Sequence, residues 1–138
     1  MKRLLLLLIP TLAIGGVALW IGLHASQPVL TISSSLINFG DIDQDGGVVS
    51  MTVEVSNTGN RALEINRIST SCGCTTATMD ETPLAPGEKR TLTIQFDPMT
   101  HPDQSGLITR VVYIQSSDPN QSEVEIDVIG NVIPKMDV

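Results

Sequence analysis

Aromatic and basic residues are both scarce in this chain, and their scarcity excludes the common modes of nucleic-acid binding. Aromatic residues make up 3% of the 138 residues, and only Phe39, Phe96 and Tyr113 follow residue 25. Two of the eight Lys and Arg residues precede residue 26, so the remaining chain carries six basic against fifteen acidic residues, a net charge of −9. Such a chain repels phosphate groups and offers too few rings to stack bases. We therefore expect no nucleic-acid partner.

The sequence also lacks the motifs of common catalytic sites. It contains no GxSxG, no HExxH and no glycine-rich phosphate-binding loop. Histidine occurs only at His24 and His101, and cysteine only at Cys72 and Cys74. We therefore expect that the protein is not an enzyme.

One long hydrophobic run is present, at the N-terminus. Residues 4–23 are uncharged and mostly apolar, and Lys2 and Arg3 precede them. A helix of this length spans the ~30 Å hydrocarbon core, and the basic pair predicts a cytoplasmic N-terminus. We expect residues 1–25 to anchor the chain in the cytoplasmic membrane by a single pass, with residues 26–138 as one extracytoplasmic domain. The alternative is a signal peptide cleaved near Ala25, which would leave a secreted or periplasmic domain.

The rest of the chain shows the period of β-strands and no helical pattern. Apolar residues alternate with polar ones, or dominate, in four runs: 49–56, 92–96, 108–116 and 123–132. Turn-forming stretches such as NTGN at 57–60 and DPN at 118–120 separate the runs. Short strands with turns at this spacing predict an all-β fold, an immunoglobulin-like antiparallel sandwich of about seven strands.

Several longer stretches carry a resemblance to a known family. They are INFGDI, VSNTGNRALEI, SCGCTTA, APGEKRTLTIQFDP, SGLITRVVYIQSSDP and IDVIGNV, in this order. Over residues 29–132 the chain resembles the domain of unknown function 1573 family, and SCGCT followed by PGE is the most specific part of the match. The resemblance implies a bacterial envelope protein with an immunoglobulin-like sandwich, similar to major-sperm-protein and Hydin-type modules. It implies no biochemical activity.

Alternating strand directions predict where the two cysteines lie. If successive strands run antiparallel, the loops at 40–47, 71–76 and 97–107 share one end of the sandwich. The first strand then starts at the other end, next to the hydrophobic run. The two cysteines, Met99 and His101 are therefore expected to lie together at the end that faces away from the membrane.

The acidic loop DIDQDGG at 41–47 resembles the first half of a calcium-binding loop. Asp41, Asp43 and Asp45 occupy its first, third and fifth places, but its twelfth place holds Thr52 instead of the required Glu. We interpret the loop as a solvated acidic turn.

The Cys72–Gly73–Cys74 triplet is compatible with several chemistries. The sulfurs can form a structural pair, buried or joined by a disulfide. An extended strand would hold the Cα atoms near the upper limit for that bond, whereas a tight bend at Gly73 would bring the sulfurs together. They can also bind copper or zinc, with Met99 or His101 completing the ligand set. Thiol–disulfide exchange and a Cys–His nucleophile are further alternatives, without the usual CxxC–helix motif or an orienting group.

The function expected from these observations is protein binding or scaffolding, with another envelope protein as the partner and no cofactor. The partner would contact the loops, or add a strand to the sheet edge formed by residues 29–40. The alternative function is metal binding or delivery through Cys72 and Cys74, with copper or zinc as the cofactor.

Overall fold

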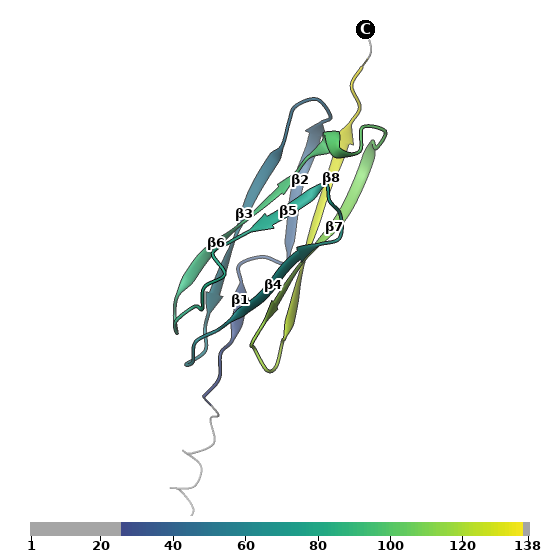
Figure 1. Cartoon of the computed structure of the whole chain (residues 1–138). Coiled ribbons are helices and arrows are strands. Elements are labelled where there is room, and N and C mark those ends of the chain that lie inside the picture. Colours follow the sequence, from purple (N-terminus) through teal and green to yellow (C-terminus); the bar gives the residue numbers. More distant parts are fainter. Residues whose placement is uncertain (1–25, 137–138) are drawn as a thin grey trace, which may run out of the picture.

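The alternating runs form strands whose apolar side chains meet between two four-stranded sheets (Figure 1). The computed structural model describes residues 26–136. The strands are β1 (Leu30–Ile32), β2 (Leu36–Asp43), β3 (Val49–Asn57), β4 (Ile65–Thr70), β5 (Thr75–Thr78), β6 (Lys89–Phe96), β7 (Gly106–Ser116) and β8 (Glu123–Ile133). One sheet has the order β1-β3-β6-β5 and the other β2-β8-β7-β4. The predicted all-β sandwich is confirmed, with eight strands described instead of about seven.

One strand pair departs from the predicted antiparallel arrangement. β1 pairs antiparallel with β3, and after residues 33–35 the chain crosses to the other sheet, where β2 pairs parallel with β8. The expectation of a wholly antiparallel sandwich is therefore wrong for this pair. The physical reason is that the short link changes the sheet without reversing the chain, so β2 continues in the direction of β1.

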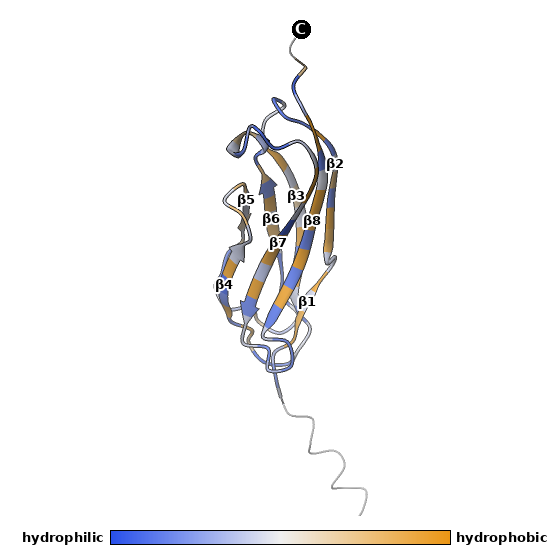
Figure 2. Ribbon diagram, turned by 90° about the vertical axis from the view of Figure 1, so that its right-hand side faces the viewer, coloured by the Kyte–Doolittle hydropathy of each residue, from blue (hydrophilic) through white to orange (hydrophobic). Residues whose placement is uncertain are grey.

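The core lies between the sheets and is mainly aliphatic. Its larger cluster includes Val53, Leu92, Ile114 and Ile126, all less than 2% exposed. A smaller cluster lies toward one end and consists of Ile42, Cys74, Phe96, Ile108 and Val132. Figure 2 shows the alternation of apolar and polar residues along β7 and β8. One face of each strand is thus buried and the other solvated, as the period-two pattern requires.

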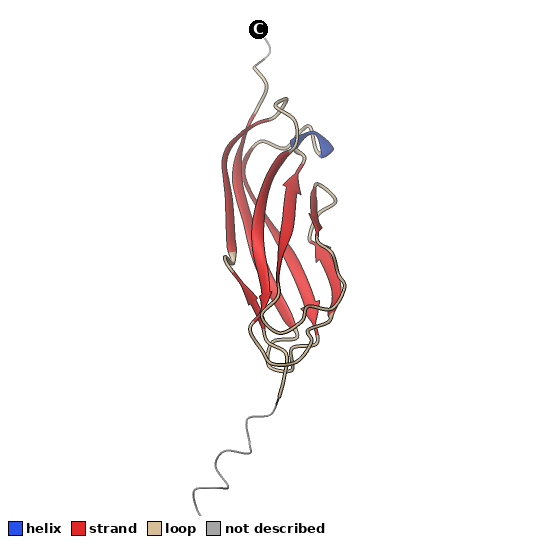
Figure 3. Ribbon diagram, turned by 90° about the vertical axis from the view of Figure 1, so that its left-hand side faces the viewer, coloured by secondary structure: helices blue, strands red, loops and turns tan. Residues whose placement is uncertain are grey.

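The loops that connect the sheets gather at two ends of the sandwich. The loops after β2 and β6 lie at the end opposite the point where the described chain begins, and the turn after β4 lies just below them in the same half (Figures 1 and 3). The side-chain amide of Gln44, after β2, donates a hydrogen bond to the Pro102 carbonyl, after β6. The predicted common end for the cysteine loop, the acidic loop and the His101 loop is confirmed.

The NTGN stretch closes the other end of the sandwich through a buried amide. Asn57 Nδ2 donates to the carbonyls of Arg61 (2.7 Å) and Leu84 (3.0 Å). Its Oδ1 accepts from the Gly59 and Val29 amides at 3.0 and 3.3 Å. Gly59 does not have a positive φ; a Cβ there would lie 2.6 Å from Val29 N, so the close approach of the entering chain requires the glycine.

The expected membrane segment at 4–23 and the alternative cleavage site near Ala25 fall outside the described residues. Within residues 26–136, no helix has the length and apolar character that a membrane crossing needs.

Candidate functional site

The two cysteines lie in a tight turn between β4 and β5, and a disulfide joins them. Their Cα atoms are 5.2 Å apart, within the range of ordinary disulfides. Of the two arrangements considered for the triplet, the structure shows the tight bend, because β4 ends at Thr70 and the chain bends over residues 71–74.

Hydrogen bonds to three other parts of the fold hold this turn. Ser71 exchanges two bonds with Val111 of β7: its amide donates to the carbonyl and its Oγ accepts from the amide, both at 2.9 Å. The Thr70 hydroxyl lies 3.0 Å from the Cys72 carbonyl oxygen and 2.8 Å from that of Thr75. The Cys74 carbonyl accepts from the Asp97 amide at 2.9 Å. The turn is therefore positioned by the backbone as well as by the disulfide.

The two sulfur-bearing residues differ in burial. Cys74 is 2% exposed and belongs to the smaller core cluster, together with Phe96 and Ile108. Cys72 packs against that cluster but is only partly buried. Cys74 is thus part of the packed core, while Cys72 remains accessible from solvent.

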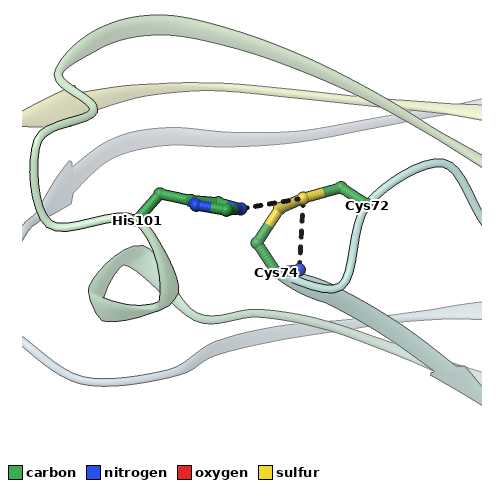
Figure 4. A group of neighbouring side chains, drawn as sticks. All are labelled: Cys72, Cys74 and His101. Carbon is green, nitrogen blue, oxygen red and sulfur yellow. Dashed lines mark hydrogen bonds between the residues drawn. A yellow bond between two sulfur atoms is a disulfide. The ribbon is translucent and has the colours of Figure 1, made fainter.

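His101 approaches the disulfide from the loop after β6. A short 3-10 helix at Pro98–Thr100 precedes it, and the Asp97 side chain caps the helix by accepting from the Met99 amide at 2.9 Å. The helix brings His101 Nε2 to 3.6 Å from Cys72 Sγ (Figure 4). The sequence-based expectation that His101 lies beside the cysteines is confirmed.

Met99 and the acidic loop contribute less to this site than the sequence suggested. The Met99 side chain is 52% exposed and lies outside the core cluster that contains Cys74. Asp41 Oδ1 accepts from Asn131 Nδ2 at 2.8 Å, and Asp45 lies 3.9 Å from Lys135 Nζ. Within residues 26–136, the three side chains Cys72, Cys74 and His101 form the one group of three or more His, Cys, Asp or Glu ligands suited to a metal ion.

Arg110 is the neighbour that sequence reasoning missed. Its Nε donates to Cys74 Sγ at 3.2 Å. The guanidinium is also held by Gln104 Oε1 and by the Thr109 carbonyl, both at 2.7 Å. The sequence contained one weak indication, a single arginine in the otherwise apolar middle of the run 107–114. The pairing of β4 with β7, which brings Arg110 to the cysteine turn, joins residues 42 to 51 positions apart in the chain and leaves no local pattern.

A surface pocket lies beside the disulfide. It has a volume of about 480 Å³ and is lined by His101, Pro102, Asp103, Gln104 and Arg110. His101 and Arg110 line this pocket and also contact the sulfurs. A molecule in the pocket would therefore approach the disulfide past these two side chains.

Comparison with solved structures supports the fold. A protein of unknown function from Porphyromonas gingivalis W83 is similar at 25% identity and a TM-score of 0.70, over 81% of this chain and 50% of that one. The ASH/PapD-like domain 7 of human CEP192 is similar at 11% identity and a TM-score of 0.64, over 99% of both chains. The periplasmic chaperone SfaE is similar at 11% identity and a TM-score of 0.51, over 78% of this chain and 59% of that one. The present chain thus spans half the length of the Porphyromonas protein.

These similarities place the domain among the immunoglobulin-like, PapD-like sandwiches. A comparison with curated proteins found no match. Residues 30–132, which include the cysteine turn and all the described strands but for the last residue of β8, match the family described as "Protein of unknown function (DUF1573)". The match covers well over half of the chain, and the chain therefore belongs to this family.

Proposed function

We propose that this protein is a membrane-anchored, extracytoplasmic binding module that takes an extended segment of another envelope protein along the free edge of β2. The observation that carries the proposal is an open edge strand, β2, with a pocket that extends from β2 across β8 to the exposed Leu107 of β7.

The β2 edge has the length that strand addition needs. β2 is eight residues long and pairs with β8 on one side only, at the end of its sheet. The other edge strands, β1, β4 and β5, have three, six and four residues. An unpaired edge offers backbone N–H and C=O groups to a further strand. β2 is therefore the best template for a partner strand among the described edges.

A pocket next to this edge can select the side chains of the partner. It has a volume of about 370 Å³ and is lined by Asn38, Gly40, Asp41, Leu107, Ile108, Thr109, Ile129, Gly130 and Asn131. Leu107, which lines this pocket, is 87% exposed and offers an apolar contact to a partner. Main-chain bonds to β2 would supply affinity, and the pocket would supply specificity.

The N-terminal run and the disulfide support an extracytoplasmic compartment. The run at 4–23 after Lys2 and Arg3 favours an uncleaved anchor with its N-terminus inside. A disulfide persists in the oxidising space outside the cytoplasmic membrane. The net charge of −9 after residue 25 disfavours anionic lipid and nucleic acid as partners, which leaves another envelope protein.

Site-specific photo-crosslinking tests this function. A photoreactive residue at position 38 on β2 should crosslink a partner in intact cells, and one at position 76 on β5 should not. Leu107→Lys should abolish the crosslink with a stability change within about 0.5 kcal/mol, because the side chain is exposed. Met51→Lys, on the other sheet and 40% exposed, is the matched control. Equal crosslinking from positions 38 and 76, or no effect of Leu107→Lys, contradicts the proposal.

A second candidate function is the binding of copper or zinc by the reduced cysteine pair. Ligand atoms of Cys72, Cys74 and His101 all lie within 4.8 Å of one another. The ion would bind only the dithiol form, because a disulfide offers no thiolates. Native mass spectrometry of the protein, reduced and purified without chelator, tests this. A bound ion in the reduced protein that is lost after thiol alkylation supports metal binding. A metal-free mass of the reduced protein before alkylation contradicts it.

A further inference from the structure

We propose that the Cys72–Cys74 disulfide is a redox-active site that accepts two electrons from the dithiol of a partner protein. In this assignment Cys72 is the sulfur that is attacked, Cys74 is the departing thiolate, and Arg110 stabilises its charge. The inference is independent of the β2 edge, since it concerns different residues and a different pocket.

The burial of the two cysteines sets the order of attack. Cys74 is 2% exposed and packs against the apolar core, so an incoming thiolate cannot reach its sulfur. Cys72 is partly exposed, and its Sγ lies 3.6 Å from His101 on the side of the solvent pocket. In thiol–disulfide exchange, access decides which sulfur is attacked.

The surroundings of Cys74 Sγ suit a leaving group. Arg110 Nε donates to this sulfur at 3.2 Å, and the Thr75 hydroxyl lies 3.7 Å from it. Among residues 26–136, no carboxylate lies within ion-pair distance of Arg110. Its positive charge is therefore directed at the sulfur. A charge-assisted hydrogen bond of this kind becomes stronger as the sulfur takes up negative charge.

The pocket lined by His101 and Arg110 lies next to the disulfide, because both of these side chains also contact a sulfur. Its wall carries the guanidinium of Arg110 and the carboxylate of Asp103, so the pocket as a whole has no excess of positive charge. A volume of about 480 Å³ admits the cysteine side chain of a protein loop. A thiolate in this pocket would approach the disulfide from the side of His101, which lies beside the accessible Cys72.

The exchange balances in two steps. A thiolate of the partner attacks Cys72 Sγ, a mixed disulfide forms, and the electron pair of the Cys72–Cys74 bond moves to Cys74 Sγ. The second thiolate of the partner then attacks its own sulfur in the mixed disulfide, and Cys72 leaves as a thiolate. The partner dithiol is oxidised to a disulfide, and the Cys72–Cys74 pair takes up two electrons and two protons.

The turn can survive the reduction because other bonds hold it. The hydrogen bonds of Ser71, Thr70 and the Cys74 carbonyl to β7, β5 and the loop after β6 involve no sulfur atom, so reduction removes none of their donors or acceptors. The disulfide also closes a loop of minimal length, since the cysteines are two residues apart. Disulfides stabilise folds least when the loop is short. Stabilisation of the fold is thus a weak explanation for this disulfide, and its reversible reduction is compatible with the fold.

Reduction kinetics of the full chain in detergent test the proposal. The protein is mixed with dithiothreitol as the dithiol probe, quenched, alkylated and analysed by mass for two new thiols. Arg110→Met should slow the reduction about tenfold or more, because the departing thiolate loses a charge-assisted bond. Arg110→Lys should restore part of the rate. Arg61→Met, on an exposed residue in the loop after β3, should behave as the wild type.

The direction in which Arg110→Met changes the reduction rate distinguishes stabilisation of the leaving thiolate from a purely structural role of Arg110. If Arg110 only packed over the disulfide, its removal would expose the sulfurs and leave the rate unchanged or faster. Such a result, or a disulfide that excess dithiothreitol does not reduce in the folded chain, overturns the proposal.

Single-cysteine variants test the order of attack. With oxidised glutathione, Cys74→Ser should form a mixed disulfide at Cys72 at least about tenfold faster than Cys72→Ser does at Cys74, because only the first sulfur is accessible. Equal rates, or the reverse order, overturn the assignment of Cys72. Circular dichroism of each variant confirms the fold. Crosslinking from position 38 reports separately on the binding function, so failure of either proposal is distinguishable.

Discussion

Asp118 joins the turn between β7 and β8 to the first strand of the domain, and its replacement by asparagine is the sharpest test of the packing described above. The carboxylate is 3% exposed. Its Oδ2 accepts from the Leu30 amide at 2.9 Å, and its Oδ1 accepts from the Asn120 and Gln121 amides at 2.9 and 3.2 Å. Asp118→Asn keeps the size of the side chain but leaves one acceptor oxygen and turns an NH₂ group toward an amide donor.

The stability lost in Asp118→Asn should be a substantial part of the free energy of unfolding of the domain. At least one charge-assisted bond disappears, worth about 1.5–3 kcal/mol, and a buried N–H is left without an acceptor. Small domains are stable by about 5–15 kcal/mol. We therefore expect Asp118→Asn to lower the free energy of unfolding at pH 7 by about 2–3 kcal/mol. Asp127→Asn, on an exposed residue of β8, should change it by less than about 0.5 kcal/mol.

The effect should depend on pH with a definite sign. Burial by itself raises the pKa of Asp118, but the hydrogen bonds from the Leu30, Asn120 and Gln121 amides outweigh burial and hold the pKa below its ordinary value. A lowered pKa means that the ionised group contributes stability above the unfolded value of about 3.9, and that this contribution is lost as the pH falls through the folded pKa. The difference between wild type and Asp118→Asn should therefore shrink in acid.

Urea unfolding followed by circular dichroism, on the full chain in detergent at pH 7 and at successive values below pH 4, measures this difference. Asp80 and Glu88 also have lowered pKa values, for which the largest causes are hydrogen bonds from Thr82 and from Ala85, but they are present in both proteins and cancel in the comparison. A wild-type stability in Asp118→Asn at pH 7, or a difference that does not change with pH, would refute the reasoning.

Two further predictions concern the end of the sandwich where the chain enters. Asn57→Asp should lower the free energy of unfolding by about 2–4 kcal/mol in urea titrations, because a carboxylate cannot donate to the two carbonyls that Asn57 Nδ2 contacts; unchanged unfolding midpoints would contradict this. Gly59→Ala should lower the free energy of unfolding by about 1–3 kcal/mol, because its Cβ would meet the backbone of residues 27–29. It should also increase the rate of amide hydrogen exchange at Leu30. Normal exchange at Leu30 in a stable variant would show that the entering chain is not held there.

Much of the site was predictable because it depends on local chemistry. The two cysteines and His101 are the rare reactive residues of the chain, and counting strand reversals was enough to place them at one end. The details were less accessible. Whether the triplet bends or extends depends on where β4 stops. β4 ends at Thr70, and at Ser71 it is the side-chain Oγ that accepts from the amide of Val111 on a distant strand. Arg110 became part of the site through the pairing of β4 with β7.

The sequence by itself determined the sandwich, because the period-two alternation and the turn residues are properties of neighbouring residues. It also determined the acidic charge and the family. Only the tertiary structure decided the parallel pairing of β2, the different burial of Cys72 and Cys74, and the contacts of Arg110 and Asn57. These depend on the register between strands far apart in the chain, and that register is set by how two whole sheets bury their apolar faces against each other.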